Sequence, residues 1–344
     1  MNQGEMTVAS QALVRFPSLA KVASRAVSES TMRRVLALVM VFAALAAASP
    51  TASAVRLGVV LAGSSLVFWH AMTKGIKQAA EDEHVEVVMR NPSDGASLGT
   101  QPNIQLRMID YMVHSRVAGI LLVPEPLENV ATPVSIPVPT VLIDRSSSDY
   151  NAISTVSTDN FAAGKKAALS LVPTLGRGAK VAVLRLAPNI SSTTERENGF
   201  LSVARESQWD VVVNTYVGYR PREAEGLIAK ALNAYAGHLD AVFAPAEPVA
   251  YAALRVIDTK AAGDRPRLVV FDWRPEFMDG LKRGVVYADV VQDPYRMGYL
   301  SVEALTASLR GHPPRSKVFV DVVTVTPNNL NDPAIRAVLE NYAQ

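Results

Sequence analysis

Short apolar runs alternate with amphipathic stretches along most of the chain, from about residue 55 onward. The runs lack the regular polar positions that a strand with one solvated face would show. Near-continuous apolar strands are typical of a parallel sheet that helices cover on both faces. The predicted buried strands are Leu57–Leu61, Gly119–Val123, Val138–Ile143, Val181–Leu184, Val211–Val213, Ala241–Ala244, Leu268–Phe271 and Ala288–Val291.

The stretches between these runs predict helices. Met72, Ile76 and Ala79 recur at helical spacing after the first strand, and Ser64 and Ser65 precede them as candidate N-caps. Three of the other helices open with proline, which suits the first turn of a helix. These predicted helices are Ala162–Leu171, Thr194–Ser207, Arg222–Ala234, Pro248–Asp258, Pro275–Arg283 and Pro294–Leu309, whereas Pro124–Pro137 is predicted to be loop with at most a short helix.

The segment before the first strand predicts an export signal. Arg33 and Arg34 precede the uncharged apolar run Val35–Ala47, and the small residues Ala52–Ala54 follow it. This order is that of a secretory signal peptide, residues 32–54, and the run is shorter than the about 20 residues that a spanning helix needs. An uncleaved anchor is the alternative. Residues 1–31 are either unstructured or lie upstream of a true start at Met32. We expect an exported chain that is cleaved near Ala54.

Composition narrows the class of protein further. Residues 1–54 hold five of the 34 Lys and Arg and two of the 32 Asp and Glu, so the 290 residues that follow have 29 basic and 30 acidic side chains. A net charge of −1 does not suggest a nucleic-acid surface. The chain has no cysteine, which excludes disulfides and thiolate metal sites. A length of 290 residues suits two layered α/β domains better than one.

Common cofactor and hydrolase motifs are absent. Ala62–Leu66, after the first strand, is not a GxGxxG, and the chain has no P-loop, HExxH or GxSxG. The five histidines are scattered without metal-ligand spacing, so we expect no cofactor and no metal. Asp144 and Asp272 as an acid–base pair would suit a glycosidase, but no nucleophile–base set accompanies them, and we expect a protein that is not an enzyme.

Polar and aromatic residues follow several of the predicted strands, where open parallel sheets bind ligands. Asp144 and Arg145 follow one strand, Asp272 another and Gln292 a third. A carboxylate can accept hydrogen bonds from two vicinal hydroxyls, and a guanidinium donates from a fixed fork. Phe68 and Trp69 after the first strand could stack on a sugar, and Arg196 leads into a helix of the second half. Together these are the parts of a sugar site.

Each residue taken alone also has a structural interpretation. Asp144 or Asp272 could cap the next helix, and Arg145 could be a surface ion-pair partner. Arg196 could brace a surface between domains, and Gln292 could bond backbone at a hinge. Phe68 and Trp69 could belong to the core, since adjacent helix positions face different ways.

From Val55 to about Pro327 the chain resembles the type I periplasmic sugar-binding proteins of ABC transporters, in the ribose- and galactose-binding group. The same fold forms the effector-binding core of LacI-type repressors. The resemblance rests on the order of short motifs, each weak alone. These motifs are Phe68-Trp69, Ile143-Asp144-Arg145, Thr158-Asp159-Asn160, Arg196 before Gly199-Phe200, Asp240 to Ala244, Val270-Phe271-Asp272, and Gln292-Asp293-Pro294 before Gly298.

The resemblance implies a set of ligand contacts. Phe68 and Trp69 take the stacking positions, and Asp144 and Arg145 the charged positions of the first domain. The contacts in and near the second domain fall on Arg196, Tyr219, Phe271, Asp272 and Gln292. Tyr219 depends on an alignment with some freedom around Pro221.

The chain departs from the family pattern at three places. Leu66 stands where the family often has asparagine, and Ala246-Glu247 stands where the family has asparagine and an acid. Either the ligand offers fewer hydroxyls there, or Ser64, Ser65, Glu247 or water replaces the missing amides. Trp273 stands where the family commonly has a small residue, which suggests a reshaped pocket.

The resemblance also implies two Rossmann-like domains joined by a three-segment hinge. The expected lobes are 55–157 with 293–321 and 158–292 with 322–344, with crossings near Ser157/Thr158, Gln292/Asp293 and Asp321/Val322. The implied function is capture of a monosaccharide or polyol and its delivery to a membrane permease. We expect a monomer, with a cyclic oligomer as the alternative. Presentation of a bound sugar to a sensor kinase or chemoreceptor is the alternative, whereas a repressor would need a helix-turn-helix before residue 55.

Overall fold

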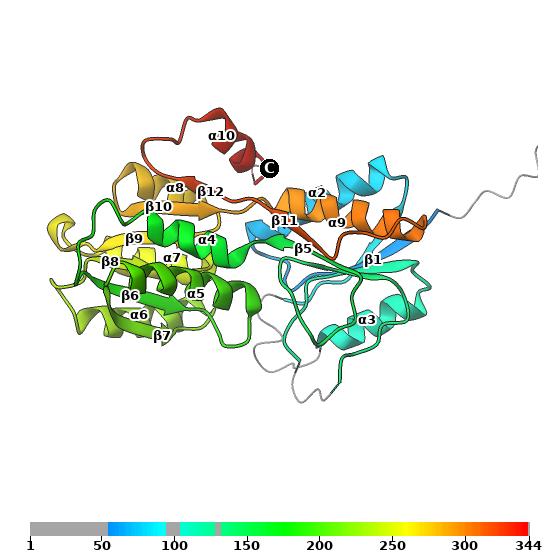
Figure 1. Ribbon diagram of the computed structural model, residues 1–344, viewed down its shortest axis with the longest axis horizontal. Helices are drawn as coiled ribbons and strands as arrows, with labels where there is room; N and C mark the ends of the chain where they lie inside the picture. The colour runs from blue at the N-terminus through cyan, green and yellow to red at the C-terminus, as the bar shows by residue number, and fades with distance from the viewer. Residues whose placement is uncertain (1–53, 94–103, 128–131, 343–344) are drawn as a thin grey trace, which may run out of the picture. The chain divides into compact units, whose positions relative to one another are not determined.

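The computed structural model describes residues 54–93, 104–127 and 132–342. The expected leader, residues 32–54, and residues 1–31 lie outside this part of the chain, apart from Ala54. The described residues form two six-stranded sheets with helices along their faces (Figure 1). The predicted α/β class with two mostly parallel sheets is thus confirmed.

The first sheet is entirely parallel. Its strand order is β11-β5-β4-β3-β1-β2. The strands are β1 (Arg56–Val60), β2 (Glu86–Met89), β3 (Gly119–Leu122), β4 (Thr140–Ile143), β5 (Ser154–Thr158) and β11 (Lys317–Val320).

The second sheet repeats this order as β12-β10-β9-β8-β6-β7. All its pairs are parallel except the edge pair, in which β12 runs antiparallel to β10. The strands are β6 (Lys180–Arg185), β7 (Asp210–Tyr216), β8 (Ala241–Phe243), β9 (Arg267–Phe271), β10 (Val286–Val291) and β12 (Val323–Val325).

Two helix pairs cross closely enough to need glycine. In α2 (Val67–Asp82) and α9 (Pro294–Leu309), a Cβ on Gly75 or Gly298 would clash with the backbone oxygen of the facing helix. In α4 (Asn160–Leu169) and α5 (Ser191–Glu206), Gly164 and Gly199 meet the facing backbone in the same way. The remaining helices are α3 (Ile104–His114), α6 (Pro221–Asn233), α7 (Glu247–Asp258), the short 3₁₀ turn η2 (Ala262–Asp264), α8 (Pro275–Lys282) and α10 (Pro333–Glu340).

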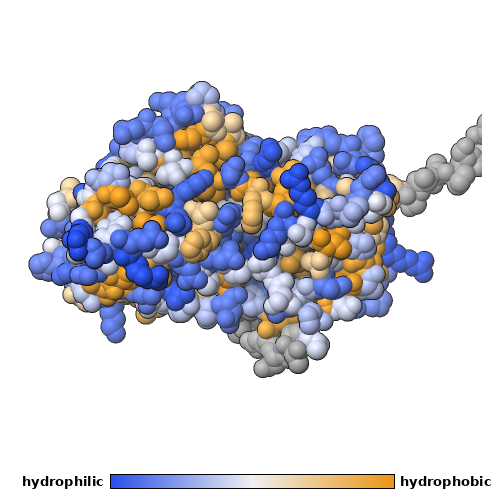
Figure 2. All heavy atoms as spheres, in the orientation of Figure 1, coloured by the Kyte–Doolittle hydropathy of each residue, from blue (hydrophilic) through white to orange (hydrophobic). Residues whose placement is uncertain are grey.

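Both faces of each sheet are buried. Leu57, Val59 and Leu121 pack under α2 and α9, whereas Val60, Ile120 and Leu122 belong to the cluster on the opposite face of the first sheet. The surface is a mixture of hydrophilic residues and separate apolar patches (Figure 2). Single exposed apolar residues such as Phe319 are ordinary on protein surfaces.

The chain passes between the sheets three times. It leaves the first sheet after Thr158, returns after Val291, and crosses once more between Val320 and Val323. The division into separate lobes at the expected residues stays a prediction.

The eight predicted strands and seven predicted helices all form, with ends shifted by up to three residues. The elements that were missed are β2, β5, β11, β12, α3, α10 and the short turn η2. The four missed strands are partly exposed or polar, as in the polar Ser154–Thr158, so they lack the apolar run used to find strands. The N-cap of α2 is Leu66, with no side-chain cap bond, so the interpretation of Ser64 or Ser65 as its N-cap is wrong.

Candidate functional site

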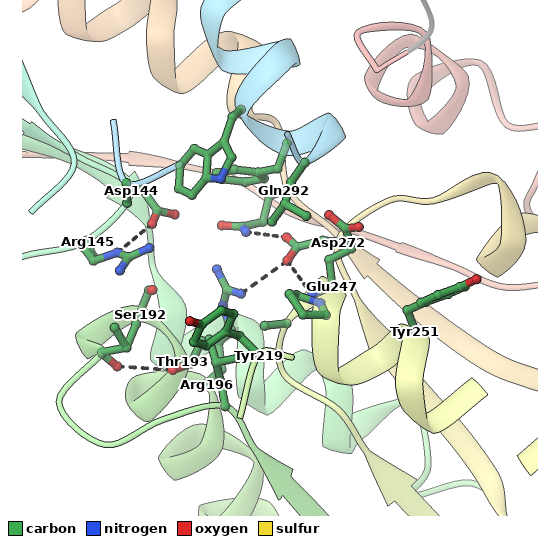
Figure 3. A pocket seen from close by; sticks show the side chains of 18 of the residues that line it. Asp144, Arg145, Ser192, Thr193, Arg196, Tyr219, Glu247, Tyr251, Asp272 and Gln292 are labelled. Carbon is green, nitrogen blue, oxygen red and sulfur yellow. Dashed lines mark hydrogen bonds and ion pairs between the residues drawn. The ribbon is translucent and has the colours of Figure 1, made fainter. Parts of the chain in front are cut away.

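A cavity of about 340 Å³ lies beyond the carboxyl ends of strands from both sheets (Figure 3). Its volume falls in the range of small-molecule sites, about 300–1,000 Å³. Nine of the ten predicted ligand-binding residues line this cavity: Phe68, Trp69, Asp144, Arg145, Arg196, Tyr219, Glu247, Asp272 and Gln292. The fold therefore brings together predicted residues that are more than 200 positions apart in the chain.

Asp144 and Asp272 occupy equivalent positions in the two sheets. Each directly follows a strand, β4 or β9, and each has a left-handed backbone, with φ of 70° and 73°. Asp tolerates this conformation better than most residues. The N–H of Asp144 donates to the carbonyl of Val156 (2.9 Å), and that of Asp272 to the carbonyl of Val290 (3.1 Å). The adjacent strand thus fixes both turns, which direct the carboxylates to the pocket.

The first polar cluster consists of Glu125, Asp144 and Arg145. Arg145 Nε donates to Asp144 Oδ2 at 2.9 Å, and its Nη1 lies 3.5 Å from Glu125 Oε1. Burial raises the pKa of Glu125, against the opposing attraction of Arg145. Burial acts to lower the pKa of Arg145, but Asp144 and Glu125 outweigh it, so the net shift is upward. The cluster holds a cation firmly between two carboxylates.

The second polar cluster consists of Arg196, Asp272 and Gln292. Gln292 Nε2 donates to Asp272 Oδ1 at 2.6 Å, and Arg196 Nη1 lies 3.8 Å from Oδ2. The backbone N–H of Glu247 also donates to Oδ2, at 3.2 Å. Thr158 fixes the amide of Gln292 by donating to its Oε1 at 2.8 Å. Burial raises the pKa of Asp272, and Arg196 opposes this shift.

Arg196 is held in place by groups on its own side of the pocket. Its Nε donates to Asn160 Oδ1 at 2.8 Å, and its Nη1 to the carbonyl of Pro245 at 2.9 Å. The close crossing of α4 and α5 at Gly164 brings Asn160 within reach. Burial lowers the pKa of Arg196, and Asp272 and then Asp144 oppose this shift.

Phe271 is the predicted site residue that does not line the cavity. Its side chain is fully buried, and its ring lies under the guanidinium of Arg196, 3.9 Å from ring centroid to Cζ. It supports the arginine from below, a role that a strand-end pattern cannot separate from ligand contact.

The aromatic residues line the pocket as a pair. The rings of Phe68 and Trp69 meet edge to face, with centroids 4.9 Å apart at 85°. Both are largely buried, yet both reach the cavity, although adjacent helix positions were expected to diverge. Tyr219 lines the cavity from the loop after β7. Trp273 is not among the lining residues; its ring packs on Tyr342, with the centroids 5.4 Å apart, and the expectation that it reshapes the pocket stays a prediction.

A third charged cluster at the pocket, around Arg274, was not predicted from the sequence. Arg274 Nη1 lies 2.6 Å from Glu247 Oε1, and the guanidinium also contacts Glu276 and the ring of Tyr251. Arg274 comes two residues after Asp272, so the strand-end rule could have found it. The other lining residues that were missed include Glu125, Leu186, Ile190, Ser192, Thr193, Arg220 and Tyr251.

The charges around the cavity balance. Of the residues that the structure describes, four carboxylates and four guanidiniums line it, and no histidine does. Among the described residues no group of His, Cys, Asp and Glu could hold a metal ion. Within the same ranges, no helix has the length and apolar character that crossing a membrane requires. The lining therefore suits an uncharged, polar ligand that fixed charges can hydrogen-bond.

Comparison with known families gives one match that covers most of the chain. The family is described as "periplasmic binding protein domain", and its model matches residues 57–313.

Relatives of similar length carry transport names. The chain is 29% identical over 250 residues to the ribose import binding protein RbsB of Bacillus subtilis, covering 71% of this chain and 78% of that protein. It is 30% identical over 217 residues to the protein of the same name from Haemophilus influenzae, covering 61% and 73%.

Solved structures share the fold. A carbohydrate transporter solute binding protein from Agrobacterium radiobacter, in complex with D-arabinose, superposes with a TM-score of 0.74 at 23% identity, covering 84% of this chain and 99% of that one. The periplasmic component of an ABC-type sugar transport system from Hahella chejuensis has a TM-score of 0.71 at 26% identity, covering 79% and 99%.

Proposed function

Because the chain belongs to the periplasmic binding protein domain family, we propose that it binds a monosaccharide or polyol in this pocket and delivers it to the permease of an ABC importer. The single observation that carries the proposal is a pair of aspartates, Asp144 and Asp272, at equivalent strand ends of the two sheets. Both have a left-handed backbone conformation. The import names of the relatives support the same function.

The two polar clusters supply the groups that bind hydroxyls. A carboxylate accepts from two vicinal hydroxyls, and the adjacent guanidinium donates to ring or hydroxyl oxygens. Each such charge-assisted bond contributes about 1.5–3 kcal/mol. Phe68 and Trp69 lie where an aromatic face or edge can pack on the C–H face of a sugar. Because the charges balance, a neutral ligand leaves no buried charge without a counter-ion.

Ligand binding favours the conformation in which both sheets contribute their groups. Asp144 follows the first sheet and Asp272 the second, so a sugar that bonds both stabilises the arrangement that brings them together. Ser191 Oγ already donates to the carbonyl of Ser146 at 2.6 Å across this gap. A permease that recognises only this arrangement would accept loaded protein and ignore empty protein.

We place this function in the periplasm, as the family name and the relatives suggest. Cleavage near Ala54 and a monomeric state are parts of the same proposal, as is the absence of a nucleic-acid partner. The sensing role is not favoured, because the relatives are named as import proteins. An assay for hydrolysis of the bound sugar tests the expectation that the protein is not an enzyme.

The direct test is thermal denaturation of the purified protein with a panel of pentoses, hexoses and polyols. A ligand at 100 times its Kd stabilises the fold by about 2.7 kcal/mol, which raises the Tm. Asp144→Asn should reduce this shift, and Asp210→Asn, an exposed position away from the pocket, is the matched control. A panel in which nothing raises the Tm would contradict sugar binding.

A further inference from the structure

The last described residues of the chain lie against strand ends that carry the second polar cluster. After α10, Asn341 and Tyr342 reach the passage from β10 to α9, near the end marked C in Figure 1. The hydroxyl of Tyr342 donates to the backbone carbonyl of Gln292 at 3.1 Å, and the amide of Asn341 donates to Asp293 Oδ1 at 3.2 Å. We call Asn341 and Tyr342 the C-terminal strap. It bonds both residues of one of the three passages between the sheets.

The strap also contacts the turn that carries Asp272. The ring of Tyr342 stacks on the ring of Trp273, the residue after Asp272, with centroids 5.4 Å apart at 28°. Tyr342 is 4% exposed and packs in the apolar cluster of the second sheet, so its ring is held on all sides. One side chain therefore contacts the residues that follow β9 and the residue that follows β10.

These two strand ends hold groups that line the pocket. Gln292 Nε2 donates to Asp272 Oδ1 at 2.6 Å, and Gln292 Oε1 accepts from Thr158, the last residue of β5 in the first sheet. The side chain of Gln292 thus joins two segments, and its backbone carbonyl joins a third through Tyr342. Because the peptide unit is planar, a fixed carbonyl restricts the backbone rotation of Gln292 and with it the direction of the side chain.

The strap links the two sheets at this passage. Asp293 is the N-cap of α9, a helix whose Met297 and Val302 pack against the first sheet. Tyr342 packs instead with the core of the second sheet. The bond from Asn341 to Asp293 therefore ties a helix of the first sheet to a segment of the second, in the arrangement where groups of both sheets line one cavity.

We propose that Tyr342 is a positioning residue for ligand binding, which holds the ends of β9 and β10 so that Asp272 and Gln292 face the pocket. This inference rests on the proposed function, because it concerns the same pocket. Groups that are already held in their bound geometry lose less freedom when a ligand binds. Without the bond from Tyr342, the ligand has to order Gln292 itself, and its affinity falls.

The first test is titration calorimetry of the full chain with the pentoses, hexoses and polyols of the thermal panel. Tyr342→Phe keeps the ring on Trp273 and removes the hydroxyl. It should weaken binding by roughly 2- to 10-fold, the contribution of one hydrogen bond. Tyr287→Phe is the matched control and should leave the affinity unchanged. The hydroxyl of Tyr287 also donates to a backbone carbonyl, that of Ser170 at 3.2 Å, and Tyr287 is not among the lining residues.

Two further measurements support this comparison. Thermal denaturation without ligand checks that both tyrosine variants fold, and we expect them to lose similar stability, since each loses one bond of the same kind. Asn341→Ala removes the other bond of the strap from a half-buried position, and it should weaken binding in the same direction as Tyr342→Phe.

A double-mutant cycle tests whether Tyr342 acts through Gln292. Gln292→Ala removes the amide that bonds Asp272 and keeps the carbonyl that Tyr342 holds. Added to this variant, Tyr342→Phe should weaken binding further by less than about twofold, because no side chain is left to position. A full further loss would show that Tyr342 does not act through Gln292, which overturns the inference.

The outcomes separate the two proposals. If the unchanged protein binds no sugar or polyol, the proposed function fails and the role of Tyr342 fails with it. If the unchanged protein binds a sugar and Tyr342→Phe binds it as tightly, sugar binding stands and the positioning role is wrong. Equal weakening by Tyr342→Phe and Tyr287→Phe would assign the effect to general stability, which also overturns that role.

Discussion

The two sheets place an aspartate at the same position and hold it by different means. Asp144 bonds the next residue in the chain, Arg145, at 2.9 Å. Asp272 bonds groups from three other segments: Gln292, the N–H of Glu247 and, at 3.8 Å, Arg196. The first half of the site is therefore a local pair, whereas the second half is a network across the sheet.

This difference shows in which half of the site ligand binding and folding stability depend on the same residues. In the first sheet Arg145 keeps Glu125 as a second carboxylate if Asp144 is lost. In the second sheet Arg196 is 2% exposed, and Asp272 is the carboxylate paired with it among the described residues. Removing one member of a buried pair leaves an uncompensated charge, which is costly. The second half of the site should therefore tolerate change far less.

The largest expected effect is on stability. Asp272→Ala should lower the free energy of unfolding by about 3–5 kcal/mol, because it leaves Arg196 buried without its carboxylate. Asp144→Ala should cost about 1–3 kcal/mol, the loss of a hydrogen-bonded group whose partner retains Glu125. Urea denaturation of both variants without ligand measures the difference. Equal losses would show that the two halves are held equally.

The next effect separates binding from folding. Asp144→Ala should weaken sugar binding by about 1.5–3 kcal/mol, or roughly 10- to 100-fold, since a charged acceptor for ligand hydroxyls is removed. The measurement is titration calorimetry with the sugar that the thermal panel identifies, and Asp210→Asn serves as the control. Unchanged affinity would show that Asp144 does not bind the sugar. The two aspartates would then differ in their contribution to stability alone.

The same contrast explains which parts of the fold and of the site could be predicted from the sequence. The apolar runs predicted both sheets because a buried parallel strand needs little else, and Asp144-Arg145 was visible because the pair is local. The partners of Asp272 come from residues 196, 247 and 292, and only the fold brings these together. Phe271 was placed at the ligand by the family resemblance, which does not reveal that its ring faces Arg196.

A second contrast lies one strand away. Asp289 of β10 pairs with Val270 of β9, in the register where β5 has Thr155 beside Leu142 of β4. Asp289 is fully buried, and neither carboxylate oxygen has a hydrogen-bond partner among the described residues. Burial, and next the charge of Asp272, raises the pKa of Asp289 well above its ordinary value. The second sheet thus holds a carboxyl where the first has a hydroxyl.

This carboxyl should make stability depend on pH. Its pKa is about 3.9 in the unfolded chain and higher in the fold, so above about pH 4 the unfolded state binds fewer protons than the folded state. Stability should then fall by about 1.4 kcal/mol per pH unit until the pH passes the folded pKa. Asp289→Asn should flatten this slope by one group's share and leave the share of the other carboxyls whose pKa is raised, which are Glu125, Glu195, Glu197, Asp272 and Asp293. Urea denaturation from pH 4 to pH 8 measures both slopes, and identical slopes would mean that Asp289 ionises freely in the fold.

The smallest effect tests what the two aspartates share. With φ of 70° and 73°, both positions favour glycine over alanine, because a left-handed backbone costs an L-residue about 1–2 kcal/mol. Glycine also loses more conformational entropy on folding than alanine, which offsets about 0.5–1 kcal/mol of this advantage. Asp144→Gly and Asp272→Gly should therefore each be about 0.5–1 kcal/mol more stable than the matching alanine variant in urea denaturation. Ser170, with φ of −61°, is the control, and there glycine should be the less stable of the two. The same difference at positions 144 and 272 would show that the turns are equivalent and that the partners alone distinguish the two halves. A difference at one position only would place the asymmetry in the backbone.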